Sequence, residues 1–270
     1  MIRCAEAVQP AVLLDHLSWS SVQTYRGCPR CFELRYVDRV PAERSSSTLI
    51  FGTAIHAAIE AIHVARMEGK AKPTEKELMS VFDSSWNEGV NRAPEIAFAK
   101  NETTASLRAL AERMLAAYLE QLHDDAEVIG VEMEFRFKLL PELPEVIGKI
   151  DLAERKGDAL VLTDFKTSKN SWNETKLSEG LPQLVLYACA CLPTLERLGL
   201  NCIKPQFCVL TKGKNPKVQK MAPEEVGRAD VERLRKMFSE TYGYIERGWF
   251  PPIESWRCSS CPYRVRCQGR

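Results

Sequence analysis

The stretch that most limits how this chain can fold is VIGKIDLAERKGDALVLTDFKTS, residues 146–168. It contains two apolar runs, each with an aspartate inside it, separated by the turn-like letters ERKGD. A buried charge is costly unless it is paired or binds a metal, so a fold that buries these runs must compensate the carboxylates. The apolar letters argue against a hairpin that is solvated on both faces.

We expect residues 146–153 and 159–166 to form two antiparallel strands joined by a short turn. A two-residue turn at Lys156–Gly157, or one residue later, places Asp151 and Asp164 on the same face of the sheet. Their Cβ atoms then lie about 4.5–5.5 Å apart if directly opposite and about 7–8 Å apart if diagonal. Both separations suit one divalent cation, whereas a loop of odd length would put the carboxylates on opposite faces.

Lys166 follows Asp164 by two residues and therefore points to the same face. Two carboxylates are the oxygen ligands that Mg²⁺ or Mn²⁺ prefers. An ammonium beside such a metal positions water and offsets charge that develops on a phosphate. The residues alone favour a metal-dependent hydrolytic site over the alternative, which is an Asp–Lys ion pair on a surface hairpin.

The rest of the chain alternates between helical and extended patterns. We expect helices at 49–69, over most of 73–124, from Pro182 to 192 and at 223–248, strands at 126–140, 146–153, 159–166 and 206–213, a polar loop at 167–180 and an irregular tail. This order predicts one α/β domain over residues 1–270 with a helical insertion at about 73–124.

Composition limits the compartment and the partners. No apolar run approaches the ~18–20 residues that span a bilayer, and the first residues make a poor signal peptide, so we expect a cytoplasmic protein without a membrane partner. The net charge is +1, which is not that of a strongly basic nucleic-acid-binding domain. Any site for a polyanion must then be a local patch.

The ten cysteines include two groups with the spacing of metal ligands. Cys28 and Cys31 form one group, and Cys258, Cys261 and Cys267 form the other. In a reducing compartment such groups suggest metal before disulfides. Two C-x-x-C pairs suit a four-thiolate zinc site, which leaves Cys267 unused. A metal bound by both cysteine groups would join the C-terminus to the first helices and stabilise the fold.

The motifs together resemble, in order, those of the PD-(D/E)xK nucleases. The resemblance is to the RecB-like branch, which includes the AddB nuclease domain and the CRISPR-associated and mitochondrial exonucleases with an iron–sulfur cluster. GKID (148–151) resembles the G-x-x-D strand, DFKTS (164–168) the D-x-K strand, FGTAIHAAIE (51–60) the histidine helix, PQLVLYA (182–188) the Q-x-x-x-Y helix, and CPRCFELRY (28–36) with the last three cysteines the cluster ligands. D-x-K alone is common, but five pieces in order are specific.

The resemblance implies a restriction-endonuclease-like core, with a central mixed β-sheet flanked by helices, a helical insertion and a cysteine-ligated C-terminal staple. It implies that the metal ligands are His56, Asp151, Asp164 and the carbonyl of Phe165, and that Lys166, Gln183 and Tyr187 complete the catalytic set with the two aspartates. Glu132 is expected to contact the metal ligands rather than the metal itself; the alternative is a position that faces solvent. From the residues alone, His56 could equally be a core histidine, or form a different cluster with Glu60 and His63.

The resemblance also implies a [4Fe-4S] cluster on Cys28, Cys258, Cys261 and Cys267, with structural Zn²⁺ as the alternative. Cys31 departs from the family pattern. If the staple forms, arginines near both cysteine groups gather into a phosphate-binding patch. These are Arg26, Arg30, Arg35, Arg39, Arg257, Arg264, Arg266 and Arg270.

The predicted function is that of a metal-dependent deoxyribonuclease acting on single-stranded DNA from an end, in DNA repair or recombination or in phage or CRISPR DNA processing. The alternative is an iron–sulfur DNA-binding module of a larger complex with an idle nuclease site. A helicase or an integrase is a conceivable protein partner. The chain carries no G-x-x-x-x-G-K-[ST] phosphate loop of its own.

Overall fold

A computed structural model of the chain describes residues 12, 14–123 and 125–268. Position 124 of the predicted insertion and Arg270 of the predicted arginine patch therefore lie outside the described residues. The chain divides into two compact units. Unit 1 comprises Met1–Ala42, Arg136–Ile147 and Glu232–Arg270, and unit 2 comprises Glu43–Phe135 and Gly148–Val231. That the whole chain acts as one domain stays a prediction.

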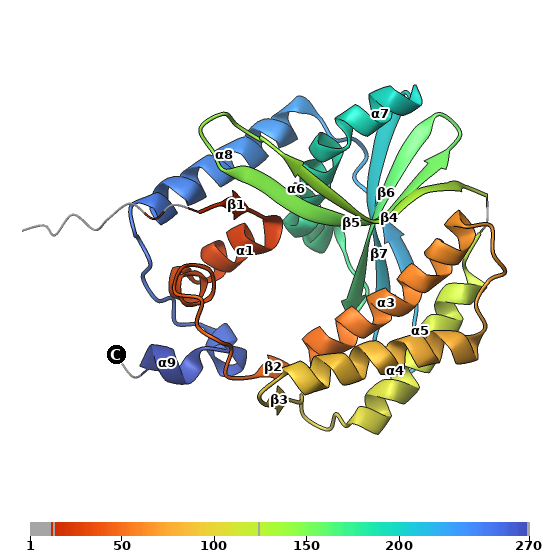
Figure 1. Cartoon of the computed structure of the whole chain (residues 1–270), viewed down its shortest axis with the longest axis horizontal. Helices are drawn as coiled ribbons and strands as arrows, with labels where there is room; N and C mark the ends of the chain where they lie inside the picture. The colour runs from red at the N-terminus through yellow and green to blue at the C-terminus, as the bar shows by residue number, and fades with distance from the viewer. Residues whose placement is uncertain (1–11, 13, 124, 269–270) are drawn as a thin grey trace, which may run out of the picture. The chain divides into compact units, whose positions relative to one another are not determined.

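A mixed β-sheet is the centre of unit 2 (Figure 1). Its strands are β4 (Glu127–Phe137), β5 (Glu145–Lys156), β6 (Ala159–Ser168), β7 (Cys202–Thr211) and β8 (Val218–Met221), and the outer ends of β4 and β5 belong to unit 1. β4 pairs with β5, β5 is antiparallel to β6, β6 is parallel to β7, and β7 is antiparallel to β8. The parallel pair β6–β7 brings the end of the D-x-K strand beside the end of β7.

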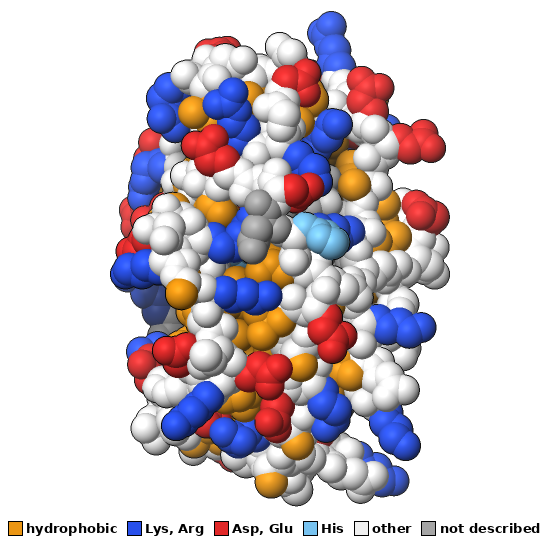
Figure 2. Space-filling model, turned by 90° about the vertical axis from the view of Figure 1, so that its right-hand side faces the viewer, with side chains coloured by type: hydrophobic (Ala, Val, Ile, Leu, Met, Phe, Trp, Pro, Cys, Tyr) orange, Lys and Arg blue, Asp and Glu red, His pale blue; other side chains and the backbone are white. Residues whose placement is uncertain are grey.

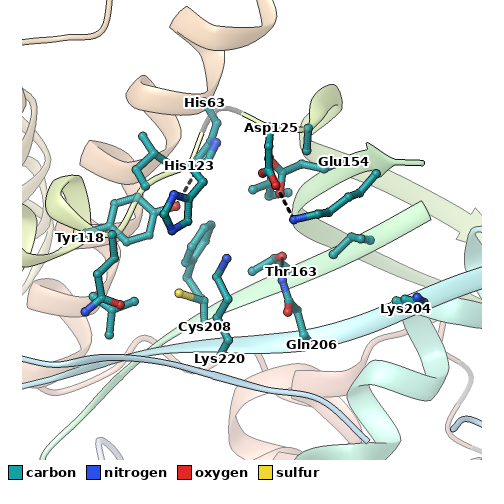
Figure 3. Close-up of a pocket in the computed structure, with 18 of the residues that line it drawn as sticks. His63, Tyr118, His123, Asp125, Glu154, Thr163, Lys204, Gln206, Cys208 and Lys220 are labelled. Atoms are coloured by element: carbon teal, nitrogen blue, oxygen red, sulfur yellow. Dashed lines mark hydrogen bonds and ion pairs between the residues drawn. The ribbon is translucent and has the colours of Figure 1, made fainter. Parts of the chain in front are cut away.

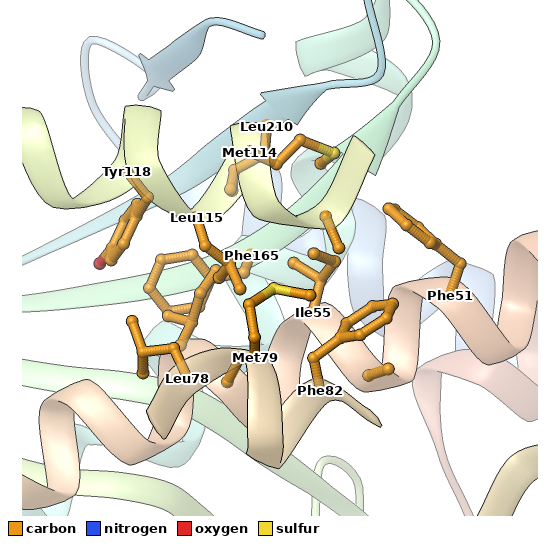
Figure 4. Close-up of a cluster of buried hydrophobic side chains, with 14 of the residues drawn as sticks. Phe51, Ile55, Leu78, Met79, Phe82, Met114, Leu115, Tyr118, Phe165 and Leu210 are labelled. Atoms are coloured by element: carbon orange, nitrogen blue, oxygen red, sulfur yellow. The ribbon is translucent and has the colours of Figure 1, made fainter. Parts of the chain in front are cut away.

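Helices cover both faces of this sheet. On one face lie α3 (Ser47–Met67), α4 (Glu75–Arg92) and α5 (Thr104–Glu120), and on the other lie α6 (Glu174–Ala190) and α7 (Leu192–Leu198). The first group shares a core with Phe165 and Leu210 of the sheet (Figure 4). The second packs against Leu160 and Leu162. Apolar side chains on both faces explain why the central strands read as nearly continuous apolar runs.

The helix α3 corrects one expectation about composition. It has 21 residues and a window with a mean hydropathy of 1.5, so by length and composition alone it could cross a membrane. The expectation that no segment of the chain is long and apolar enough to span a bilayer was therefore wrong. Phe51, Ile55 and Ile59 are fully buried among the side chains of unit 2 (Figure 4), and α3 is apolar because it is the central helix of that core.

The predicted helical insertion consists of α4 and α5. Thr74 and Thr103 begin these helices as N-caps, each accepting a hydrogen bond from a backbone N–H of the first turn. Between the helices, β3 (Ile96–Ala97) pairs with β2 (Ser45–Ser46). Leu78, Phe82 and Leu115 bury the insertion against α3.

Unit 1 is built from the two ends of the chain. Its elements are β1 (His16–Leu17), α1 (Trp19–Gly27), α2 (Pro29–Phe32), the π-helix η1 (Glu33–Val37), most of α8 (Arg228–Glu246), the 3₁₀-helix η2 (Trp256–Ser260) and α9 (Arg264–Gln268). β1 pairs in parallel with the first residues of β5. Tyr25, Phe32 and Phe250 pack ring against ring, and the Tyr25 hydroxyl donates to the Trp249 carbonyl at 2.5 Å.

Several predicted boundaries were wrong. α6 begins at Glu174 rather than at Pro182, because the Asn173 side chain caps it by accepting from the Lys176 N–H at 3.0 Å. Pro182 therefore lies inside the helix, where it lacks an N–H to donate. The strand β8 was missed within a basic stretch, and the tail contains η2 and α9 rather than only irregular chain.

Candidate active site

The turn between β5 and β6 sets the register of the two aspartates. Lys156 pairs with Ala159, so the two turn residues are Gly157 and Asp158, the second of the two predicted registers. Gly157 has φ of +62°, which a glycine adopts without steric cost. The pairing runs on to Leu152 opposite Thr163, and its next step places Asp151 opposite Asp164.

Asp164 is the most enclosed carboxylate of the site, with 2% of its surface exposed. Its Oδ1 accepts hydrogen bonds from Gln183 Nε2 at 2.7 Å and from the Tyr187 hydroxyl at 3.0 Å. Gln183 and Tyr187 lie one turn apart on α6, as the sequence spacing predicts, and contact each other at 2.7 Å. The Lys166 ammonium lies 2.6 Å from Asp164 Oδ2. The structure thus brings together four of the predicted residues.

Asp151 is held by a backbone N–H and lies near a histidine. Its Oδ2 accepts from the Phe165 backbone N–H at 2.7 Å, and His56 Nδ1 lies 3.6 Å from the same oxygen. Burial lowers the pKa of His56, so this contact joins a neutral imidazole to the aspartate. Burial, and then the charge of Asp164, raises the pKa of Asp151 to about 8. The neutral imidazole is the form that binds metals.

The donor set fits a divalent cation, although its side chains contact one another. Among the described residues, no three His, Cys, Asp or Glu side chains are gathered closely enough to hold an ion as they are placed. Asp164 Oδ2 is nevertheless buried without a hydrogen bond, since Lys166 lies close to it without hydrogen-bonding geometry. An orphaned carboxylate oxygen beside a second buried carboxylate is a site where a cation offsets the charge. Asp151, Asp164 and His56 are the side chains that would hold it.

Two further residues shape the site and were missed in the sequence. A Cβ atom at Gly148 would lie 2.4 Å from the ring of Phe135, so the glycine makes room for that ring. The ring packs edge-on against Tyr187, with centroids 5.9 Å apart. The glycine of the G-x-x-D motif therefore positions Tyr187 through Phe135. A glycine inside a strand is the signal that could have suggested this close approach.

Glu132 lies at the edge of the site. Its backbone has φ of +47° inside β4, a left-handed conformation that is rare for a residue with a side chain. The Glu132 carboxylate pairs with Lys149 at 3.1 Å, and its charge adds to burial in raising the pKa of Glu60. Glu132 thus contacts the lysine two positions before Asp151, and its predicted supporting role stays a prediction.

His63 does not join His56 and Glu60 in the alternative cluster. It is buried, and its Nε2 lies 2.6 Å from the Tyr118 hydroxyl while its Nδ1 faces Arg66 at 2.9 Å. Its ring stacks on Phe165. Both ring nitrogens therefore already have partners within the protein.

In unit 1, the five grouped cysteines of the sequence line one cavity of about 660 Å³. They are Cys28, Cys31, Cys258, Cys261 and Cys267. The Cys31 thiol is hydrogen-bonded to Cys261, and this bond and burial raise the pKa of Cys31. Burial raises the pKa of Cys267, and nearby Arg30 opposes that rise. As they are placed, no three of these described cysteines are gathered closely enough to hold a metal ion, so a metal group on them stays a prediction.

Comparison with known proteins identifies the family. A family model described as "PD-(D/E)XK nuclease superfamily" matches residues 16–268, which is nearly the whole chain. The protein belongs to the PD-(D/E)XK nuclease superfamily. This places it among metal-dependent nucleases, which hydrolyse phosphodiester bonds in nucleic acids.

Solved structures support the fold. A crystal structure of a candidate exonuclease from Eubacterium rectale is similar with a TM-score of 0.56 and 11% identity, covering 92% of this chain and 88% of that chain. Identity this low speaks for the fold alone, and it confirms the predicted α/β core with a mixed sheet flanked by helices. The crystal structure of SSO0001 has 14% identity and covers 87% of this chain and 91% of its own, but its TM-score of 0.37 is too low to support an argument. No curated protein matches the sequence.

Proposed function

We propose that this protein is a Mg²⁺- or Mn²⁺-dependent deoxyribonuclease of RecB-like type that degrades single-stranded DNA from an end. The observation that carries the proposal is the environment of Asp164. One of its oxygens is held by Gln183 and Tyr187, while the other is buried without a hydrogen bond beside Lys166. The second oxygen has an ion pair with Lys166 but no hydrogen bond, so it has lone pairs left to bind a cation.

The roles of the residues follow from their contacts. Asp151, Asp164, His56 and the Phe165 carbonyl would hold the cation, which when bound stabilises negative charge developing on a phosphate. Lys166 orients a water molecule toward the phosphorus atom and offsets the charge that forms there. Gln183 and Tyr187 keep Asp164 in one rotamer, so that the site is organised before DNA arrives.

Cleavage from an end rests on two supports, and the preference for single-stranded DNA rests on the first of them. The motifs resemble those of RecB-like exonucleases, and the similar structure from Eubacterium rectale is named as a candidate exonuclease. Figure 2 shows basic and acidic side chains interspersed on one face of the molecule, so contacts with DNA must come from local clusters. Arg35 is exposed near the cysteine cavity and is a candidate for such a contact. Arg30, which the sequence also suggested for the patch, is buried and paired with Glu33, so that prediction was wrong for Arg30.

For the cysteine cavity we propose a [4Fe-4S] cluster held by Cys28, Cys258, Cys261 and Cys267. A single zinc ion draws four sulfurs to within about 2.3 Å of one point. A cavity of about 660 Å³ has room for either group, so the choice of the cluster rests on the resemblance of the cysteine pattern. Cys31 lines the same cavity, so exchanging Cys28 and Cys31 separately for serine would identify the early ligand.

The test is an assay on protein purified without oxygen. Iron, sulfide and zinc are quantified first, and linear and circular single strands labelled at the 5′ or 3′ end are then digested with Mn²⁺, with Mg²⁺ or with EDTA. We expect about four irons per chain, cleavage of the linear strands alone and complete inhibition by EDTA. Duplex DNA and RNA of the same sequence serve as substrate controls.

Three outcomes would contradict parts of the proposal. Undiminished cleavage in EDTA would exclude the cation, and one zinc without iron would replace the cluster by the zinc alternative. DNA binding by fully metallated protein without any cleavage would favour the iron–sulfur binding module with an idle site. The complete set of His56, Asp151, Asp164 and Lys166 argues against that alternative, since an idle site has no need of its charges.

A further inference from the structure

A second cavity in unit 2 lies on the opposite face of the sheet from Asp164. Side chains along β6 alternate between the two faces, so Thr163 and Phe165 point away from Asp164 and Lys166. Thr163 and Phe165 line this cavity, which has a volume of about 310 Å³. None of the residues proposed to bind the catalytic cation through a side chain is among those that line it.

The floor and the roof of the cavity come from different elements. The floor is formed by β5, β6, β7 and β8, and the roof by the ends of α3 and α5 with the chain that follows α5. In Figure 3, Thr163, Gln206 and Lys220 rise from the strands, while His63 and Tyr118 approach from the helices. Polar and apolar groups therefore converge on one enclosed space, as in small-molecule sites.

The charges around the cavity leave an excess of positive charge. Lys156 is paired with Asp125 at 2.6 Å, and Glu154 is paired with Arg66 at 2.8 Å. Two more lysines, Lys204 and Lys220, line the cavity and form no ion pair with any residue that the structure describes.

Lys204 and Lys220 are both exposed, so their charge lies at the solvent side of the cavity. Lys220 lines the cavity together with the buried side chains of His63 and Tyr118 (Figure 3). A cation would meet repulsion here, whereas an anion would find an unpaired ammonium at Lys220.

The buried floor offers a donor for an anion. Thr163 is 3% exposed, and its Oγ1 accepts a hydrogen bond from Gln206 Nε2 at 2.9 Å. A hydroxyl that accepts one bond still has its own hydrogen to donate. Leu152, Phe165 and Val218 form an apolar wall beside this polar floor. Charged, polar and apolar side chains therefore all line the cavity.

We propose that this cavity binds a small phosphate-bearing ligand of the size of a mononucleotide. The phosphate would contact the Lys220 ammonium and the Thr163 hydroxyl, with Lys204 at the opening and the base against the apolar wall. Ligand cavities have volumes of about 300–1,000 Å³, so 310 Å³ accommodates a small ligand rather than a nucleic-acid strand. The site goes beyond the proposed nuclease activity and does not require it.

The test is calorimetric titration of the full chain with dAMP in EDTA, with inorganic phosphate and deoxyadenosine as separate arms. The variants are Lys220→Met, which keeps the length of the side chain without its charge, and Thr163→Val, which removes the hydroxyl. Lys214→Met, at an exposed lysine outside the cavity, is the matched control. Circular dichroism spectra establish that each variant is folded.

We expect dAMP to bind at least tenfold more weakly to Lys220→Met and to Thr163→Val, and equally to Lys214→Met. Deoxyadenosine should bind at least tenfold more weakly than dAMP to the wild-type chain. Phosphate that binds as tightly as dAMP, with the same sensitivity to Lys220→Met, would support the site and assign inorganic phosphate as its source.

Two results would overturn the proposal. One is the absence of dAMP and phosphate binding at millimolar concentration. The other is dAMP binding that survives in Lys220→Met and Thr163→Val but is lost in Asp164→Asn, because the nucleotide would then occupy the catalytic site. Calorimetric binding of dAMP and of phosphate can still be measured if the nuclease assay fails. The two proposals can therefore fail separately.

Discussion

The carboxylate site of unit 2 and the cysteine cavity of unit 1 hold their functional groups in different ways. Asp151 and Asp164 stand on paired strands, and each is also fixed by hydrogen bonds from protein groups. The five cysteines lie at helix ends and on short helical turns from both ends of the chain. The carboxylates keep their geometry through the sheet, whereas the cysteines depend on whatever group they bind.

The two sites differ in what the free energy of ligand binding contributes to, catalysis in one and folding in the other. At the carboxylate site, strand pairing and hydrogen bonds from the protein hold the framework, so we expect a bound cation to serve chemistry. At the cysteine cavity, a bound metal group would join segments from both ends of the chain, so its binding energy would count as folding energy. Removing a ligand side chain should therefore abolish activity in one place and stability in the other.

The largest expected effect is on cleavage, in variants of the carboxylate site. Asp164→Asn or Lys166→Met should slow the digestion of end-labelled single strands by roughly 10²–10³-fold or more. The first weakens the hold on the cation, and the second removes the ammonium that offsets charge on the phosphate. The melting temperature should change little. Lys176→Met, at an exposed lysine of α6, is the control. Full activity in either variant would end the catalytic assignment.

The next effect is on stability, in variants of the cysteine cavity. Cys258→Ser or Cys261→Ser should lose metal and lower the free energy of unfolding by several kcal/mol, because structural metal binding contributes about 10–16 kcal/mol to folding in small metal domains. Metal analysis and thermal unfolding measure both. Cys202→Ser, outside the cavity, should retain both, and unchanged stability in Cys258→Ser would contradict the comparison.

A smaller effect concerns pH and the buried imidazole of His63. Burial lowers its pKa from an ordinary 6.5 to about 3, so on acidification the unfolded chain takes up the proton first. The stability that the neutral imidazole provides is complete above pH 6.5 and is lost as the pH falls toward 3. Between pH 7 and pH 5 the loss is about 2 kcal/mol.

Denaturant unfolding at several pH values measures this loss. In His63→Gln the free energy of unfolding should fall by about 2 kcal/mol less between pH 7 and pH 5 than in the wild type, because glutamine does not titrate. An identical slope in the variant and the wild type would show that another group is responsible.

The smallest effect tests the turn that sets the register. Gly157→Ala introduces a Cβ atom into open space, with nothing within 4 Å, at φ of +62°. Only backbone strain then acts, which costs about 1 kcal/mol. The melting temperature should fall by a few degrees while cleavage per folded molecule is retained. Gly213→Ala, at a loop glycine without positive φ, is the control.

Much of the candidate site could be predicted because its spacing is local. Two strands joined by a short turn can pair in few registers, so Asp151, Asp164 and Lys166 had to share a face. Gln183 and Tyr187 lie one helical turn apart, which holds wherever the helix begins. The start of α6 was misplaced because polar letters after Asn173 resemble a loop until the cap is considered.

Other features depend on residues far apart in the chain. Phe135 fills the space above Gly148, and His63 is bonded to Tyr118 and faces Arg66 rather than a metal. The lysine-lined cavity behind the catalytic strand exists because helices from the insertion roof over the polar ends of β5 to β8. Neither spacing nor composition signals such contacts.

The sequence by itself predicted which residues would carry the chemistry. It also determined which of them share a face, because strand and helix periodicities act over a few residues. The tertiary structure decided which carboxylate oxygen stays open and which histidine remains available. It also decided where unpaired lysines gather. Those outcomes depend on burial and on partners from distant segments, which only packing brings together.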